Sequence, residues 1–286
     1  MEAGATVSIG FIGLGNLGAP MARQLLKLGE EILVLDVAEA RVAELTALGA
    51  RAGSVRELAE SCRVIGLCVR DEPEVAGLLH GPSGLLAQVR EDTIIIIHST
   101  VTQAAVLEWA QAARQRAVHL LDAPVTGGAA GAQAGTLTYM VGGAEPEVER
   151  CRPLFMTSAA KLIHAGPVGS GILLKLCNNL MSYAAFTAVD EAVRLARAGG
   201  LDPALVVEVG RSNGVVTAQM EAFLANRGRL TAAGSQALQQ VFAPFAALAQ
   251  KDLAAALASA QALGLELPGT RSVAERIENV FLNQGN

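Results

Sequence analysis

The sequence is poor in paired cysteines, basic clusters and long apolar runs, and each shortage excludes a class of protein. The four cysteines have no CxxC spacing, which excludes a disulfide framework or structural zinc site and predicts reduced thiols in the core at Cys62, Cys68, Cys151 and Cys177. The 22 Lys and Arg residues are scattered and fewer than the 27 Asp and Glu residues, so we predict no nucleic-acid partner. Although 51% of the residues are hydrophobic, no run approaches about 18 apolar residues, and we predict no membrane span.

Histidine is also scarce, and its spacing argues against a metal site. The four histidines show neither HxxxH nor HExxH spacing: His80, His98, His119 and His164. We therefore predict no metal, and we leave open a role for His98, which follows a predicted strand. The opening residues Met1–Gly4 contain no basic segment, and no cleavage signal follows, which predicts a cytoplasmic protein.

The first part of the chain alternates short apolar runs with helical stretches, a pattern typical of βαβ units on a parallel sheet. Gly29 and Gly49 stand where two of the helices would stop. We expect residues 1–165 to form a Rossmann domain, a doubly wound, mostly parallel sheet. Its expected strands are Val7–Ile12, Ile32–Asp36, Val64–Val69, Thr93–Ile97, His119–Leu121, Leu137–Val141 and Lys161–His164. Its expected helices are Leu17–Leu28, Glu39–Leu48 and Ala104–Gln115.

After Gly169 the strand pattern ends, and the remaining sequence is predicted to be helical. One uninterrupted helix is expected over 170–198, a second after Asp202 and Pro203, and others near 245–263 and 270–282. Residues 166–286 are therefore predicted to form an all-α domain, joined through the long helix. We expect a substrate cleft between the two domains, and a homodimer or homotetramer formed through the apolar helices.

The first chemical motif is a glycine-rich loop, Gly13-Leu14-Gly15-Asn16-Leu17-Gly18, between a predicted strand and a predicted helix. In this setting the glycines permit a tight turn, close approach to a pyrophosphate and close helix packing. Asp36 ends the next strand, where a carboxylate binds the ribose hydroxyls of NAD and repels the 2′-phosphate of NADP. The alternative role for Asp36 is a helix N-cap. We favour NAD as the cofactor, with NADP less favoured.

A second glycine loop follows the strand at 119–121. Thr126, Gly127 and Gly128 offer a hydroxyl and two backbone amides, which suit a small carboxylate. The alternative is an ordinary turn before a strand.

The long helix contains Lys175 and Asn179, which are four residues apart and share one face. Their neighbours are apolar, so we expect the Lys175 amine to be shielded from water, which favours its neutral, proton-accepting form. The alternative is a lysine whose ammonium reaches the surface.

These motifs together resemble the β-hydroxyacid dehydrogenase family, which includes 3-hydroxyisobutyrate dehydrogenase and tartronate semialdehyde reductase. The resemblance covers nearly the whole chain and rests on four ordered segments, Gly10–Ala22, Asp122–Gly135, Gly169–Asn179 and Lys251–Leu253.

The resemblance implies a role for each matching residue. Lys175 would be the general acid and base, Asn179 would orient the substrate, and Thr126, Gly127 and Gly128 would hold its carboxylate. Thr100 and Lys251 would contact the cofactor or close over the cleft. Thr126 stands where the family usually has Ser, which narrows the pocket. Val69-Arg70 replaces a frequent Leu-Pro, which alters a loop that faces the cofactor.

Several alternatives remain. A 6-phosphogluconate dehydrogenase places Glu seven residues after the lysine, where this chain has Ser182. An imine reductase usually lacks the lysine and prefers NADP, and a methyltransferase has no use for the Lys175 helix. A semialdehyde reductase and a non-catalytic dinucleotide sensor also remain. We predict an NAD-dependent dehydrogenase of a small 3-hydroxy acid, similar to 3-hydroxyisobutyrate.

Overall fold

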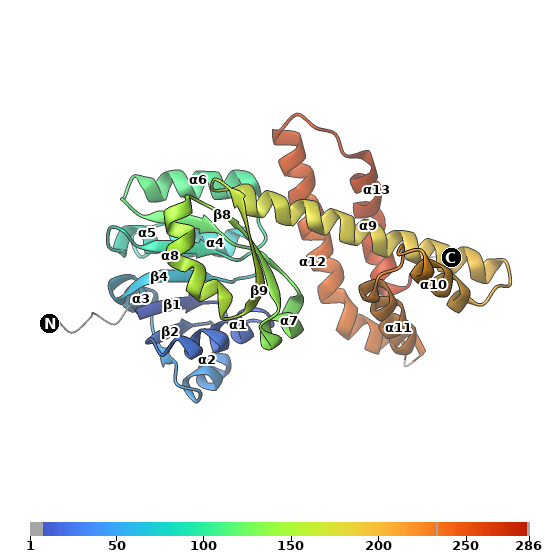
Figure 1. The fold of residues 1–286 in the computed structure, drawn as a ribbon, viewed down its shortest axis with the longest axis horizontal. Coiled ribbons are helices and arrows are strands. Elements are labelled where there is room, and N and C mark those ends of the chain that lie inside the picture. The colour runs from blue at the N-terminus through green and yellow to red at the C-terminus, as the bar shows by residue number, and fades with distance from the viewer. Residues whose placement is uncertain (1–7, 233, 285–286) are drawn as a thin grey trace. The chain divides into compact units, whose positions relative to one another are not determined.

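The structure is a computed structural model that describes residues 8–232 and 234–284. Contacts divide the chain into two compact units, Met1–Lys175 and Leu176–Asn286. Figure 1 follows the chain through both units.

The first unit is built on one sheet. In its described residues the strands are β1 Ser8–Ile12, β2 Ile32–Leu35, β3 Arg51–Ala52, β4 Cys62–Leu67, β5 Ile94–Ile97, β6 His119–Asp122, β7 Val125–Thr126, β8 Leu137–Gly142 and β9 Ala159–Gly166. The strand order is β3-β2-β1-β4-β5-β6-β8-β7, and β9 pairs with β8. The first six strands in this order are parallel, and β8 runs antiparallel to both β6 and β7. The strand order reverses direction at β1 and β4, which is where ligands bind in sheets of this type.

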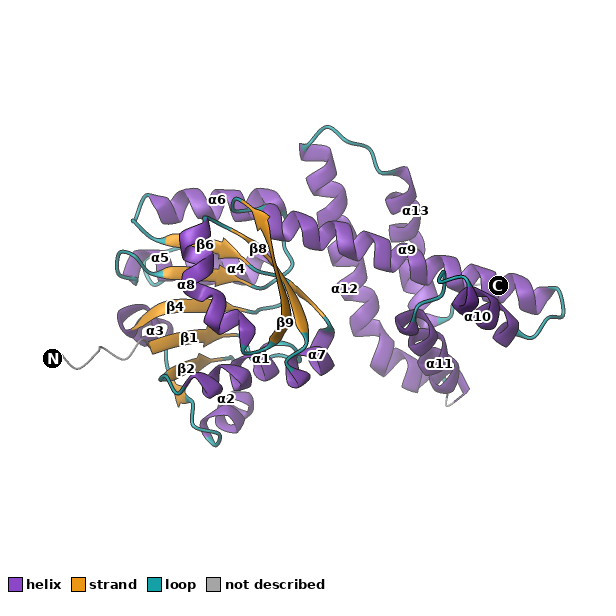
Figure 2. Cartoon of the chain, in the orientation of Figure 1, coloured by secondary structure: helices purple, strands orange, loops and turns teal. Residues whose placement is uncertain are grey.

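Helices cover both faces of this sheet (Figure 2). The first face packs against α1 Gly18–Leu25, the 3-10 helix η1 Leu26–Leu28, α2 Glu39–Thr46, α7 Gly128–Ala134 and α8 Glu145–Met156. The other face packs against α3 Val55–Ser61, α4 Glu72–Leu79, α5 Leu85–Gln88 and α6 Gln103–Arg114. The four isoleucines of β5 show why this strand is uniformly apolar. Ile94 and Ile96 belong to the first core, and Ile95 and Ile97 to the second, because successive side chains point to opposite faces.

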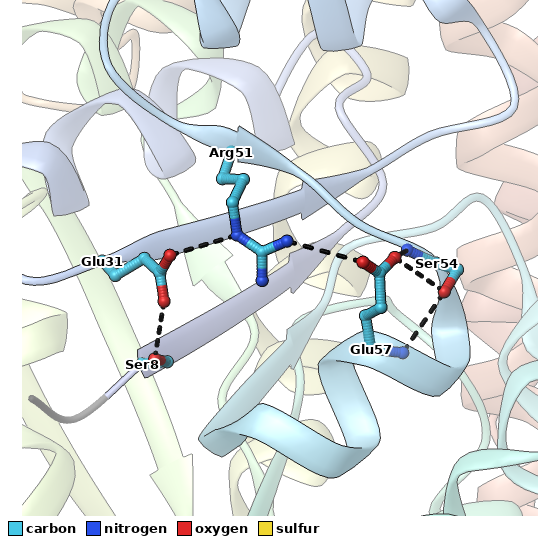
Figure 3. A network of polar contacts seen from close by, with 5 residues as sticks. All are labelled: Ser8, Glu31, Arg51, Ser54 and Glu57. Carbon is cyan, nitrogen blue, oxygen red and sulfur yellow. Dashed lines mark hydrogen bonds and ion pairs between the residues drawn. The ribbon is translucent and has the colours of Figure 1, made fainter. Parts of the chain in front are cut away.

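A polar network holds the edge of the sheet at the amino ends of the strands (Figure 3). Glu31 accepts hydrogen bonds from Ser8 Oγ at 3.0 Å and from Arg51 Nε at 3.1 Å. Arg51 also reaches Glu57, which forms a capping box with Ser54 at the start of α3. Because the side chains of Glu31, Arg51 and Glu57 are about half exposed, their ion pairs contribute little energy, on the order of 1 kcal/mol each or less. Their effect is to hold the short edge strand β3. The network lies at the amino end of β1, whereas the glycine loop follows its carboxyl end.

The second unit is helical. Helix α9 Ser170–Ala198 begins in the first unit and continues into the second, where α10 Pro203–Ser212, α11 Ala218–Ala232, α12 Ser235–Ala262 and α13 Pro268–Leu282 follow. Its core is an aromatic cluster of Phe186, Phe223, Phe242 and Phe281, with ring centroids 4.7 to 5.9 Å apart. Beside this cluster, Arg227 and Asp190 form a buried ion pair at 2.6 Å.

The predicted fold class, a Rossmann sheet followed by helices, is confirmed, and several details need correction. Val7, expected to begin the first strand, lies outside the described residues. The long helix was predicted correctly, but α12 begins at Ser235 rather than near 245 and continues through Pro244. Eight elements were not predicted from the sequence: the short strands β3 and β7 and the helices α3, α4, α5, α7, α8 and α11.

Two helices bear on the prediction that the chain has no membrane span. Ser170–Ala198 and Gln236–Ala262 are long and apolar enough to cross a membrane by length and composition alone. Two such helices are weak evidence for a membrane span, because the core helices of soluble proteins meet the same criterion, so the absence of a span stays a prediction. Both helices carry buried polar groups, among them Asn179, Asp190 and Asp252, which make hydrogen bonds or ion pairs inside the second unit.

Candidate active site

The glycine loop has the geometry that a dinucleotide requires. Gly13 has φ +96°, and a Cβ there would overlap the carbonyl oxygen of Cys68. A Cβ on Gly18 would overlap the carbonyl oxygen of Gly13, so α1 packs tightly against the turn. A Cβ on Gly15, in contrast, would meet nothing nearer than Arg41 Nη1 at 3.7 Å. The middle glycine therefore leaves room for a phosphate group to approach the backbone at the start of α1.

Asp36 stands beside this loop. Its carboxylate accepts hydrogen bonds from the Leu14 N–H at 2.6 Å and the Ala38 N–H at 2.8 Å. It is half-buried, and a carboxylate has about four acceptor positions, so two bonds leave capacity for ribose hydroxyls. The N-cap of α2 is Ala38, so Asp36 is not itself the N-cap residue, although it binds the N–H of that residue.

The loops after β4 and β5 are joined by hydrogen bonds. Ser99 Oγ accepts from the Val69 N–H at 3.0 Å and donates to the Val69 carbonyl at 2.7 Å. Glu72 accepts from the N–H and the hydroxyl of Thr102 at 3.0 and 2.8 Å. Thr100 is half-buried between these two connections. Val69 and Thr100 were predicted from the sequence, whereas Ser99, which holds Val69, and Glu72, which holds Thr102, were not.

Neighbouring carboxylates bind both cationic residues that were assigned to the cofactor. The Arg70 guanidinium binds Glu74 four residues later, and the Arg70 N–H donates to the same carboxylate at 3.0 Å. Lys251, in the second unit, places its Nζ 3.0 Å from Asp252 Oδ1.

The loop expected to hold a substrate carboxylate is anchored at one side and open at the other. Thr126 pairs with Thr138 across β7 and β8, and its side chain is half-buried. Gly127 and Gly128 have φ values of +122° and +62°, a region that favours glycine. Both are exposed, and a Cβ on Gly128 would meet nothing within 4 Å. The loop therefore has accessible backbone beside the Thr126 hydroxyl.

Helix α9 carries Lys175 and Asn179 one turn apart. Lys175 is half-buried, whereas Asn179 is 7% exposed. Asn179 Nδ2 donates to Asp252 Oδ2 at 2.7 Å, and the Tyr183 hydroxyl donates to the same oxygen at 3.0 Å. Burial and the Asp252 charge raise the pKa of Tyr183, so its hydroxyl remains a hydrogen-bond donor. Asp252 thus fixes the Asn179 amide, a function that the sequence analysis did not assign.

His98 is part of the core. It is 6% exposed and stacks on Phe11 with ring centroids 5.7 Å apart. Its Nδ1 lies 2.9 Å from the Ala123 carbonyl, and burial lowers the pKa of His98 to about 4. The ring is therefore neutral, and its Nδ1–H donates a hydrogen bond to that carbonyl, which supports the strand end before Thr126. Among residues 8–232 and 234–284, no three His, Cys, Asp or Glu side chains gather as metal ligands would.

The sheet brings most of the predicted residues to one edge. The glycine loop, Asp36, Val69 and Thr100 follow β1, β2, β4 and β5, which are adjacent parallel strands, so they lie at the same ends of those strands. Thr126 follows β6, the next strand in the sheet. Lys175 is the last residue of this unit, while Asn179 and Lys251 belong to the second unit.

An open glycine loop, an acidic residue after the second strand and a lysine helix after the sheet define an NAD-binding oxidoreductase of the Rossmann type. Residues 8–166 match the family model for the NAD binding domain of 6-phosphogluconate dehydrogenase. Residues 169–286 match the model for the NAD-binding domain of NADP-dependent 3-hydroxyisobutyrate dehydrogenase. The chain belongs to the β-hydroxyacid dehydrogenase family, as the sequence motifs predicted.

Individual relatives agree with this family. The chain is 37% identical to the NAD-dependent L-serine dehydrogenase of Pseudomonas aeruginosa, over 97% of this chain and 93% of that one. It is 38% identical to the 3-hydroxyisobutyrate dehydrogenase of the same organism, over 70% of this chain and 68% of that one. A solved structure of Mycobacterium tuberculosis 3-hydroxyisobutyrate dehydrogenase with L-serine superposes with a TM-score of 0.79 at 28% identity, covering 95% and 92% of the two chains.

Proposed function

We propose that this protein oxidises the hydroxyl group of a small 3-hydroxy acid, similar to 3-hydroxyisobutyrate, with NAD as the hydride acceptor. One observation supports this proposal most directly. The helix that carries Lys175 starts against β6, the strand that leads into the Thr126–Gly128 loop, so the proposed base and the proposed carboxylate site share one anchor. A 3-hydroxy acid carries its hydroxyl and its carboxylate at opposite ends of a three-carbon unit, so the hydroxyl would face Lys175 while the carboxylate binds the Thr126–Gly128 loop.

The proposed mechanism assigns each group a task. Gly127 and Gly128 N–H groups and the Thr126 hydroxyl bind the carboxylate. Lys175, in its neutral form, accepts the proton of the substrate hydroxyl, and Asn179 orients this hydroxyl through an amide that Asp252 holds. When bound, NAD would accept the hydride from the substrate carbon. In the reverse direction Lys175 returns the proton to the carbonyl oxygen.

We further propose that residues 1–165 form the cofactor domain and that residues 166–286 complete the substrate site and form a homodimer or homotetramer. Exposed apolar side chains support the oligomer, among them Leu195, Val209 and Phe245 at 76%, 62% and 53% exposure. A groove of about 1120 Å³ in the same unit is lined partly by Val193, Val207 and Leu224. The described cysteines are all free, which agrees with a cytoplasmic location, and we also propose that location. Cys62 and Cys151 are buried as predicted, whereas Cys68 is half-buried and Cys177 is exposed, so the prediction of core thiols was wrong for Cys177.

The experiment that tests the function is a rate measurement on a panel of substrates. NAD⁺ or NADP⁺ reduction is followed with 3-hydroxyisobutyrate, L-serine, glycerate, 3-hydroxybutyrate and a 4-hydroxy acid. We expect turnover with a 3-hydroxy acid, and a kcat/KM at least tenfold higher with NAD⁺ than with NADP⁺ because Asp36 repels a 2′-phosphate. NADH binding without turnover on any member of the panel would contradict the proposal and favour a dinucleotide sensor.

A further inference from the structure

The start of helix α9 is held by a side chain from elsewhere in the chain. Asp122 Oδ1 accepts a hydrogen bond from the Gly169 N–H at 2.7 Å, and Oδ2 accepts one from the Ile172 N–H at 2.6 Å. These are the N–H groups of the residue before the helix and of its third residue, which a capping box normally satisfies from nearby side chains. Gly169 has no side chain with which to do so, and Asp122 provides both acceptors from the end of β6.

This arrangement joins two parts of the proposed active site. Asp122 is the last residue of β6, and four residues later the chain reaches Thr126. Lys175 lies six residues after Gly169, about one and a half turns into the helix. We propose that Asp122 is a positioning residue that sets the Lys175 amine against the Thr126–Gly128 loop. This inference rests on the proposed function of Lys175.

The cost of burying this carboxylate supports a positioning function. Asp122 is fully buried, and burial raises its pKa even though the Gly169 and Ile172 N–H groups favour the charged form. An ionised carboxylate away from water is stabilising only when hydrogen bonds and the positive end of a helix offset its lost hydration. An apolar residue would fill the same place at lower cost, but it would leave the start of the helix unattached.

Two glycines make the close approach possible. A Cβ on Gly142 would overlap Asp122 Oδ1, and a Cβ on Gly171 would overlap the Met140 carbonyl oxygen and lie 2.7 Å from the Asp122 carbonyl oxygen. Neither glycine has a positive φ, so the backbone conformation does not require glycine at either place. Glycine is required at both places because α9 packs directly against the sheet there.

The test is Asp122→Asn, which keeps the size of the side chain but can accept only one of the two hydrogen bonds. We expect kcat for the best hydroxy acid to fall at least tenfold while the dissociation constant for NADH changes less than twofold. Hydrogen exchange at the Gly169 and Ile172 amides should accelerate at least tenfold. The matched control is Asp202→Asn, because exposed Asp202 caps α10 through the Ala204 N–H and should leave kcat unchanged.

A second variant covers the case in which Asp122→Asn does not fold. Gly171→Ala improves helix propensity but displaces the helix start from Met140, so we expect the same selective loss of kcat. Unchanged kcat in a folded variant with faster amide exchange would overturn the inference, as would unchanged exchange in Asp122→Asn. If Lys175→Met retains activity, the proposed function fails. If Lys175→Met is inactive but Asp122→Asn is fully active, only the positioning role fails.

Discussion

His98 and Lys175 differ in how far their side chains are accessible to water. His98 is enclosed by the rings of Phe11, Tyr139 and Phe155, which keep it neutral and away from water. Lys175 keeps part of its surface accessible on a helix that leaves the sheet. A sequence motif identified the lysine, but the histidine could not be assigned from sequence. Its environment is formed by residues from three distant segments, whose packing no local pattern reveals.

The burial of His98 predicts how stability depends on pH. Because its folded-state pKa is lowered from 6.5 to about 4, the stabilisation is fully present above about pH 6.5 and is lost as the pH falls towards 4. Between pH 7.5 and 5 the free energy of unfolding should fall by about 2 kcal/mol from this group. Urea unfolding of His98→Asn should show a pH dependence flatter by that amount. His80→Asn, at an exposed position, should keep the parent slope; equal slopes in all three proteins would refute the prediction.

Arg41 is a residue that the sequence analysis missed, although it lies in the first turns of the helix after Asp36. Its guanidinium is the nearest group to the open side of Gly15, where a phosphate would approach. We expect Arg41→Leu to raise the dissociation constant of NADH about tenfold, equivalent to about 1.4 kcal/mol. Arg56→Leu, which removes an exposed ion pair with Glu60, is the control in a fluorescence titration. A change below twofold in Arg41→Leu would show that Arg41 does not bind the cofactor.

At the scale of secondary structure, the elements with one strong period were predictable and the short or mixed ones were not. The run Ile94–Ile97 and the long helix Ser170–Ala198 match their predicted positions closely. Strand β7 consists of two residues inside a glycine-rich loop and exists because it pairs with β8. Helix α11 contains Gly228 and lacks a continuous apolar stripe, so its helical state depends on packing around Phe223. The glycine loop was predictable because its function depends on residues that are adjacent in the sequence, whereas β7 and α11 depend on packing against other segments.

At the scale of the whole molecule, the exposed apolar surface of the second unit predicts self-association. Val241, Phe245 and Leu248 lie on one face of α12 at 44%, 53% and 43% exposure. Light scattering after size-exclusion chromatography should therefore give the mass of two or four chains. Phe245→Glu should shift the protein towards smaller species, because a charge on a buried interface is costly. Leu48→Glu, at a similarly exposed position in the first unit, should leave the mass of the assembly unchanged. A mass of 29.5 kDa for the parent protein, that of a single chain, would contradict the prediction.

Lys175 is proposed to be the acid and base that moves the hydroxyl proton during hydride transfer. The most direct measurement is the single-turnover rate of NADH formation by Lys175→Met, with saturating NAD⁺ and the best hydroxy acid. Lys161→Met, which removes an exposed lysine of β9 in the same unit, is the control. We expect Lys175→Met to form NADH about 10³-fold more slowly while binding NAD⁺ normally, and Lys161→Met to equal the parent. A Lys175→Met rate within tenfold of the parent would show that another group moves the proton.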